Sequence, residues 1–395
     1  MKRNAAWRPL ADGAIPSMRQ LAVAASLSLT VFLQPVVGQT AFTSIHVFSD
    51  GVATTTDNTD GIAPRFGNRF CNGPVWVEVL SEWQGLTYVE SNNVSAFNFE
   101  SADILDILTD PASPTPYVTP ADVATGLFVL WTNNADYVEF LNGTSDSGVM
   151  AEAPFDDPED LPQWQSFGDN VIDQHEMIVQ ELYDRGVRTL VIPLAVDFLS
   201  VPVFSNFQTS DRDFAEARVS EFNAGLQQML DSLLPTLPGL TVYVPDAFDL
   251  FEEILSDPSA FGATVSNIGA TVDLFNPVLS LPTLDGPGAD YVFWDQFHPT
   301  ARIQVFIADL FQQAITPAQV TGIDVETGEI EIINAPVGRP GFVVGSDDLL
   351  IWDLDVPSFT STSTLHTESV PVVDPTRFFQ VGFPVPEANL PTTGE

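Results

Sequence analysis

The chain has very few basic residues. Of its 395 residues, 13 are Lys or Arg and 53 are Asp or Glu, which gives a formal net charge of -40, and Lys2 is the only lysine. A surface with this charge repels nucleic acid and anionic lipid, so we expect no nucleic-acid partner. An acidic, lysine-free surface suits a salty medium, where mobile cations screen the self-repulsion, although simple solubility would explain it as well.

Cysteine is almost absent too. Cys71 stands alone, so no disulfide can form within the chain and the core must supply the stability. The sequence also lacks a Walker loop, a G-x-G-x-x-G pattern after a strand and a Cys/His cluster with metal spacing, so we expect no cofactor and no metal. The acidic pairs Asp156-Asp157 and Asp347-Asp348 are interpreted as solvated loop charge rather than calcium ligands.

The N-terminus combines basic residues with an apolar run. Four basic residues between Lys2 and Arg19 precede the run from Leu21 to Val37. This order is typical of a secretory signal, and the run is short for a bilayer span, so residues 1–38 are predicted to be a signal peptide. The mature protein would then be secreted or extracytoplasmic, with no stable membrane span after signal removal.

Short apolar runs alternate with longer helical patterns through most of the chain. The runs rich in β-branched residues span 44–48, 127–131, 189–193 and 240–244, and the helical patterns span 74–83, 171–182, 214–233 and 299–311. Alternation of this kind predicts an α/β fold, a three-layer α/β/α domain over residues 43–316. We expect a central parallel sheet of about five strands, with a ligand crevice at the carboxyl ends of the strands.

The pattern changes after residue 316. β-forming residues alternate or cluster from there to residue 381, and no helical period appears, which predicts a small all-β module over residues 317–381. Its segments 346–352 and 376–381 weakly resemble β-sandwich modules appended to bacterial exported proteins. Residues 382–395 are interpreted as a polar tail.

Four segments of the α/β region share features with one enzyme family. They are Val47–Val52, Arg69–Glu78, Asp249–Gly262 and Phe293–Thr300. The first ends the first predicted strand with Val-Phe-Ser-Asp-Gly-Val, and the last reads Phe-Trp-Asp-Gln-Phe-His-Pro-Thr. Together they resemble the SGNH/GDSL hydrolases, which carry Phe-Gly-Asp-Ser-Leu, Arg-Phe-Ser-Asn-Gly-Pro-Val-Trp and Phe-Trp-Asp-x-x-His-Pro-Thr at these places. The resemblance implies the flavodoxin-like fold of that family.

The resemblance also implies a set of catalytic positions. In the family a serine attacks an ester carbonyl, a histidine takes its proton, and an aspartate three residues before the histidine orients the imidazole. Here His298 and Asp295 match the last two, and Asp50 matches the aspartate beside the serine. Gly51 stands at the serine position and has no side chain to act as a nucleophile. Ser49, two residues upstream, is the only nearby substitute.

Further positions follow from the family's oxyanion hole. The asparagine donor of its Gly-x-Asn-Asp turn corresponds to Ala135 in the segment Asn133–Asp136, and Asn134 could replace it if the loop shifts by one residue. The glycine of the second block corresponds to Ala96. Trp294, beside the family's aspartate, is the best candidate for an aromatic residue lining the cleft.

The predicted function is that of a secreted SGNH/GDSL esterase/lipase-family protein that is catalytically impaired and binds a saccharide or acyl ligand in the inherited cleft. The loss of a serine nucleophile alone costs about a millionfold in rate. The alternative is an active ester hydrolase, a carbohydrate or lipid esterase, that uses a rearranged nucleophile with the Asp295/His298 pair. In both cases the partner would be a small molecule or a polysaccharide that carries ester or saccharide groups. A third alternative is a structural role in an exported scaffold.

Overall fold

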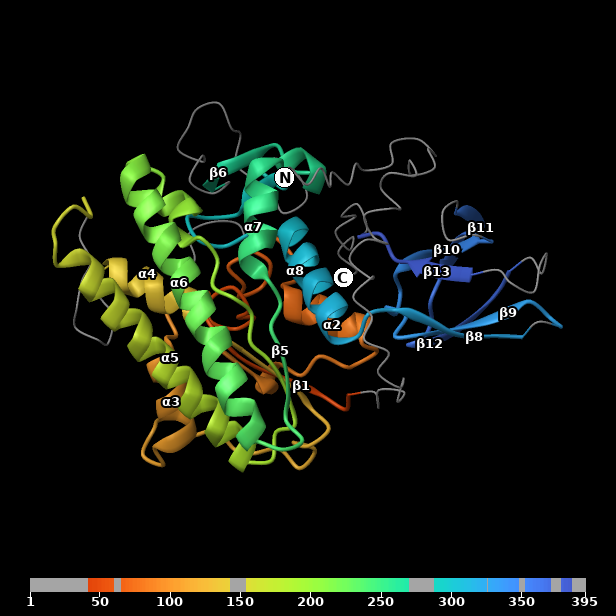
Figure 1. The fold of residues 1–395 in the computed structure, drawn as a ribbon, viewed down its shortest axis with the longest axis horizontal. Coiled ribbons are helices and arrows are strands. Elements are labelled where there is room, and N and C mark those ends of the chain that lie inside the picture. Colours follow the sequence, from red (N-terminus) through yellow and green to blue (C-terminus); the bar gives the residue numbers. More distant parts are fainter. Residues whose placement is uncertain are drawn as a thin grey trace.

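The structure, a computed structural model, describes residues 42–59, 65–142, 154–269, 288–324, 326–347, 352–370 and 378–385. The predicted signal peptide and the tail beyond residue 385 lie outside the described residues. An α/β domain is followed by a β-rich domain, and the two lie side by side (Figure 1).

Five short strands form the central sheet of the α/β domain. They are β1 (Ile45–Ser49), β2 (Asn93–Ser95), β3 (Leu127–Trp131), β4 (Thr189–Val191) and β5 (Thr241–Tyr243), in the order β2-β1-β3-β4-β5. All four neighbouring pairs are parallel, and every residue of β1 and β3 is buried. Continuous apolar runs suit strands that are covered on two faces. The predicted parallel sheet is therefore confirmed.

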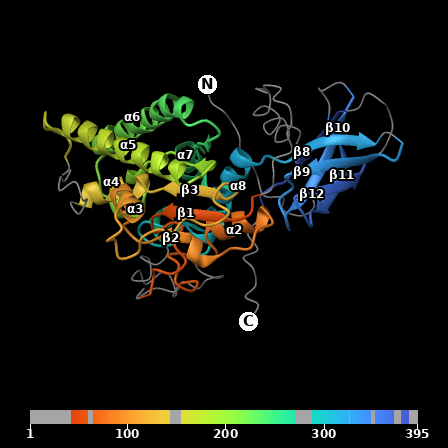
Figure 2. The same ribbon diagram turned by 90° about the horizontal axis from the view of Figure 1, so that it is seen from below.

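Helices cover the sheet on both sides. They are α2 (Trp76–Trp83), α3 (Ser101–Thr109), α4 (Asn133–Asn142), α5 (Asp160–Asp184), α6 (Thr209–Leu233), α7 (Ala247–Ser256) and α8 (Ala301–Ile315). Figure 2 shows α5 and α6 over one face and α2 below the other. None of the described helices is long and apolar enough to cross a membrane.

Two further parallel strands lie outside the central sheet. They are β6 (Val265–Gly269) and β7 (Tyr291–Phe293), which pair with each other. β7 leads directly into the segment that carries His298, and α8 begins three residues after His298. The histidine is thus held between a strand and a helix.

The C-terminal domain consists of two antiparallel three-stranded sheets. One contains β8 (Gln319–Asp324), β9 (Glu329–Ile333) and β12 (Leu365–Ser369), and the other β10 (Pro340–Ser346), β11 (Asp353–Thr360) and β13 (Phe378–Gly382). Their inner faces share a separate apolar core that includes Ile330, Ile332, Val343 and Phe359. The change to β structure after residue 316 thus appears as predicted.

Arg339 joins the two domains. Its guanidinium is buried, lies 4.5 Å from the ring of Trp83 on α2, and pairs with Asp309 on α8 at 2.5 Å. It also donates to the carbonyl groups of Phe383 and Pro384. A single side chain therefore contacts two helices of the α/β domain and the end of the β domain.

One local prediction is wrong. The segment Asn133–Asp136 was expected to be a turn, but it forms the first turn of α4. Asn and Asp favour turns in short loop segments. They also favour the first turn of a helix, because their side chains can accept hydrogen bonds from the backbone N–H groups that lack partners there. The helix places residues one turn apart, such as Ala135 and Glu139, on the same face.

Candidate active site

The first part of the site is the turn that follows β1. The carboxylate of Asp50 accepts a hydrogen bond from the amide of Val52 at 2.9 Å, which fixes this turn. Ser49 is fully buried, and its hydroxyl donates to the carbonyl of Trp131 on β3 at 2.9 Å. Ser49 thus links two strands and cannot serve as a replacement nucleophile.

The second part is the histidine. Nδ1 of His298 lies 2.8 Å from Oδ2 of Asp295, and Oδ1 of Asp295 accepts the amide N–H groups of Phe297 and His298 at 2.8 and 2.7 Å. The imidazole stacks on Phe70 with ring centroids 4.6 Å apart. Burial alone would lower the pKa of His298, but the charge of Asp295 and its hydrogen bond raise this pKa above its ordinary value. The ring is thus held in place by Asp295 and Phe70.

The segment Arg69–Glu78 holds the loop that carries His298. Sγ of Cys71 lies 3.5 Å from the carbonyl oxygen of Pro299, and the side-chain oxygen of Asn72 accepts the amide of Ala301 at 2.8 Å. Two segments that are far apart in the sequence therefore meet at the site. Cys71 itself is buried, and burial raises the pKa of its thiol to about 12, so it is not a reactive thiolate.

Gly51 and His298 are in unusually close contact. A Cβ atom placed on Gly51 would lie 2.4 Å from Nε2 of His298, but 3.3 and 3.4 Å from its Cδ2 and Cε1 atoms. Nε2 is thus the ring atom that faces Gly51. Because no real Cβ atom tolerates such a distance, only glycine fits here without movement of the ring. The imidazole occupies the space that the side chain of a nucleophile would need.

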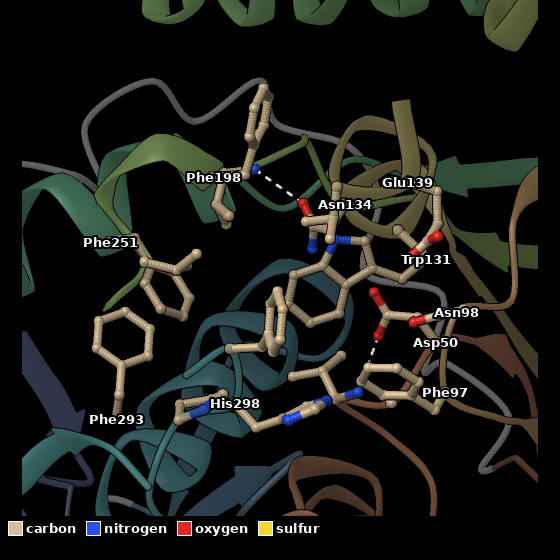
Figure 3. Close-up of a pocket in the computed structure, with 18 residues that line it drawn as sticks. Asp50, Phe97, Asn98, Trp131, Asn134, Glu139, Phe198, Phe251, Phe293 and His298 are labelled. Atoms are coloured by element: carbon tan, nitrogen blue, oxygen red, sulfur yellow. Dashed lines mark hydrogen bonds between the residues drawn. The ribbon is translucent and has the colours of Figure 1, made fainter. Parts of the chain in front are cut away.

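A pocket opens beside this pair (Figure 3). It is lined by Asp50, Gly51, Val52, Phe97, Asn98, Trp131, Asn134, Ala135, Val138, Glu139, Val196, Phe198, Val201, Phe251, Phe293, Phe297, His298 and Pro299. Most of these side chains are apolar. The described lining residues include no hydroxyl, thiol or amine, so none of them could replace a serine in the usual way.

Comparison with known proteins finds similar GDSL esterase/lipases. No family model matches the chain. GDSL esterase/lipase 7 of Arabidopsis thaliana is 29% identical over 153 residues, which cover 36% of this chain and 42% of that relative's own length. The GDSL esterase/lipase EXL3 of the same plant is 25% identical over 296 residues, or 67% of this chain and 77% of the relative. The chain is thus similar to GDSL esterase/lipases, as the sequence motifs predict.

One solved structure is also similar to part of this chain. Axe2, an acetylxylan esterase from Geobacillus stearothermophilus, has 12% sequence identity and a TM-score of 0.38, and the match covers 70% of this chain and 97% of Axe2. The chain spans less than half of GDSL esterase/lipase 7. This similarity therefore leaves the chain's own activity and ligand to be argued from its pocket.

The structure brings together most of the positions that the SGNH/GDSL resemblance implies. Asp50, Gly51, Asn134, Ala135 and His298 all line the pocket, and Asp295 stands behind the histidine. Two expected residues are not among the lining residues: Ala96 and Trp294. Trp294 is only 2% exposed and packs against Tyr291, so its interpretation as a cleft aromatic is corrected.

The region that corresponds to the oxyanion hole differs from the SGNH/GDSL pattern. Ala135 offers only a methyl group. The side-chain oxygen of Asn134 accepts the amide of Val196 at 3.0 Å, and Figure 3 shows its amide nitrogen turned toward the pocket. Two residues after Ala96, Asn98 lines the pocket with a φ of 64°, a conformation that glycine adopts most easily and asparagine tolerates. Asn98 was missed because the sequence shows no positive φ directly.

Sequence reasoning also missed Glu139 and most of the aromatic wall. Glu139 lies one helical turn after Ala135 and therefore on the same face of α4. This spacing carries no meaning when residues 133–136 are interpreted as a loop. The phenylalanines of the wall come from separate elements and carry no local pattern.

Asp50 also brings a titratable carboxyl group to the pocket. Burial raises its pKa to about 6, although the amide of Val52 and the charge of His298 act in the opposite direction. At neutral pH it is mainly a carboxylate. The pocket therefore holds negative charge beside an apolar wall.

Proposed function

We propose that this protein, which is similar to GDSL esterase/lipases, binds an apolar acyl or ester ligand in the pocket and does not hydrolyse it. One observation carries the proposal: Gly51 faces Nε2 of His298 so closely that no nucleophile side chain fits between the backbone and the ring. The mainly apolar lining favours an acyl ligand over a saccharide, which would need more hydrogen-bonding partners.

The expected loss of rate is large. Removal of a serine nucleophile costs about a millionfold, and removal of one oxyanion donor costs about a hundred- to a thousandfold. Gly51 corresponds to the loss of the nucleophile, and Ala135 corresponds to the loss of the oxyanion donor. The two losses do not simply multiply, but together they leave little beyond positioning of the substrate.

A second candidate function is slow ester hydrolysis by a water molecule that His298 activates. The intact hydrogen bonds between Asp295 and His298 favour it, because they orient the imidazole as in a working hydrolase. The direction of Nε2 toward Gly51 speaks against it. We therefore retain ligand binding as the primary proposal.

Covalent labelling separates the two classes of mechanism. Intact-mass spectrometry after treatment with a fluorophosphonate probe should show no adduct on the unmodified protein, because no serine faces His298. Gly51→Ser and the double variant Gly51→Ser/His298→Ala serve as comparisons. A stoichiometric adduct on the unmodified protein that disappears in His298→Ala would overturn the proposal.

Binding needs its own measurement. Phenyl acetate should raise the melting temperature of the unmodified protein, and Val138→Phe should abolish this shift because Val138 lines the pocket. Val89→Phe is the matched control, since Val89 is 44% exposed and is not among the lining residues. Equal shifts in both variants would place the ligand elsewhere.

We also propose that the protein acts outside the cytoplasm. The basic N-terminus and the following apolar run support export, and the acidic surface is compatible with it. N-terminal sequencing of the protein from a secreting host should give a first residue near position 39. Retention of Met1 on an exported chain would contradict this prediction.

A further inference from the structure

Aromatic rings dominate the wall of the pocket. Six of the lining residues are aromatic: Phe97, Trp131, Phe198, Phe251, Phe293 and Phe297. They belong to separate parts of the fold, yet Phe97 and Phe297 meet at 6.1 Å and Phe251 and Phe293 at 6.4 Å between ring centroids. The faces of such rings carry partial negative charge and attract cations.

Two carboxyl groups lie within the same wall. Asp50 and Glu139 are 8% and 4% exposed, and both line the pocket. Figure 3 shows them on the side of Trp131, across the pocket from Phe251 and Phe293. No lysine or arginine is found among the described residues that line the pocket. A ligand inside would meet Asp50, Glu139 and Trp131 on one side and the rings of Phe251 and Phe293 on the other.

Any positive charge on His298 is balanced by Asp295. Its Nδ1 pairs with Asp295, which is outside the pocket lining, and its Nε2 is directed at Gly51 rather than at the open space. The His298–Asp295 pair therefore has little net charge. Asp50 and Glu139 leave the pocket with a negative balance, and the -40 charge of the whole chain has the same sign. An anionic ligand such as a free fatty acid would be repelled.

We propose that the pocket is selective for organic cations, namely esters or amphiphiles that carry a quaternary or protonated amine head. The head would lie against the aromatic rings near Asp50 and Glu139, and the apolar remainder would fill the rest of the pocket. This inference rests on the proposed function and adds the chemical class of the ligand.

Two esters of nearly the same shape test the proposal. Acetylcholine and 3,3-dimethylbutyl acetate differ in the charge of one central atom, nitrogen or carbon, so a comparison of their dissociation constants isolates the charge. Isothermal titration calorimetry should show acetylcholine binding at least about tenfold more tightly. Equal affinities would overturn the cation proposal and leave ligand binding itself intact.

A variant of Glu139 tests whether the preference for acetylcholine arises in the pocket. Glu139→Gln should weaken acetylcholine about tenfold and leave the neutral ester unchanged. The control is Glu176→Gln, because Glu176 is exposed on α5 and its charge contributes only to the general field. An equal loss in the two variants would assign the preference to that general field and overturn the proposal.

The same titrations distinguish this inference from the proposed function. Hydrolysis of either ester that depends on His298 would overturn the non-hydrolysing function, whereas a retained preference for acetylcholine would still support the cation site. If neither ester binds, both proposals fail.

Discussion

The contact between Gly51 and His298 determines what the site can do. Nε2 would lie 2.4 Å from a Cβ atom on residue 51, and the ring cannot retreat freely because Asp295 and Phe70 hold it. A serine at position 51 would have to displace the imidazole. Restoring the nucleophile alone therefore does not restore the geometry of a triad.

The first prediction concerns Gly51→Ser. We expect it to lower the free energy of unfolding by about 1–3 kcal/mol, because the added atoms overpack the contact with His298. Urea unfolding followed by tryptophan fluorescence measures the change. Gly322→Ser is the control, since a Cβ atom there meets nothing within 4 Å. A Gly51→Ser protein as stable as Gly322→Ser would show that the imidazole moves at no cost.

Residues of the site differ in how far the sequence could predict them. Gly51, Asp50, Asp295 and His298 stand in recognisable motifs next to a predicted strand or helix. Trp294 belongs to the same motif but points into the core, where it meets Tyr291. A motif gives the position of a residue along the chain, and only the packing decides which way its side chain turns.

At the scale of elements, a buried polar network connects α3, α4 and α5. The carboxylate of Asp136 accepts hydrogen bonds from the amide and hydroxyl groups of Ser101 at 2.8 and 2.6 Å, and the hydroxyl lies 3.4 Å from Nδ1 of His175. Burial raises the pKa of Asp136 to about 7 and lowers that of His175 to about 4. Both side chains are thus favoured in their neutral forms in the folded protein at mildly acidic pH.

The second prediction concerns Asp136→Asn. Because the folded-state pKa of Asp136 is raised, its contribution is fully present below the unfolded pKa of about 4 and is lost as pH rises to about 7. The stability of the variant relative to the unmodified protein should therefore increase by about 3–4 kcal/mol between these pH values and then level off.

Urea unfolding at a series of pH values measures this difference. The control is Asp106→Asn. Asp106 is exposed and lies on α3, the helix whose first residue, Ser101, donates its amide to Asp136. A pH-independent difference for Asp136→Asn would mean that Asp136 has the same pKa in the folded protein as in the unfolded chain.

The sequence predicts those helices and strands that have a clear local pattern of apolar residues. β1, β3, β4 and β5 coincide with apolar runs that the sequence shows directly. β2 (Asn93–Ser95) is short and largely polar, and it pairs with the edge of β1. The start of α4 was taken for a turn because Asn133, Asn134 and Asp136 favour turns locally. Its helical state depends on packing against neighbouring elements, which single-sequence patterns do not contain.

At the scale of the whole molecule, one buried arginine lies at the contact between the two domains. Arg339 pairs with Asp309 and lies over Trp83, as described above. The third prediction is that Arg339→Met destabilises the protein by about 3–5 kcal/mol, because Asp309 and two carbonyl groups lose their partner. Differential scanning calorimetry should resolve two transitions in place of one. A single transition at the original temperature would show that the joint depends on other contacts.

The charge of the whole chain leads to a fourth prediction. A formal charge of -40 produces self-repulsion that salt screens. The melting temperature should rise as NaCl is increased to about 1 M, and most of the increase should occur at the lower concentrations, where the Debye length changes most. A melting temperature that does not depend on salt would show that the acidic groups are too widely spaced to interact.

The central claim is that the pocket binds without hydrolysis, and its most direct test is turnover of p-nitrophenyl acetate by the unmodified protein beside His298→Ala. The structure predicts that the two proteins release p-nitrophenol at the same rate, close to the rate without protein, because Gly51 offers no nucleophile to His298. Turnover by the unmodified protein that His298→Ala abolishes would contradict the claim.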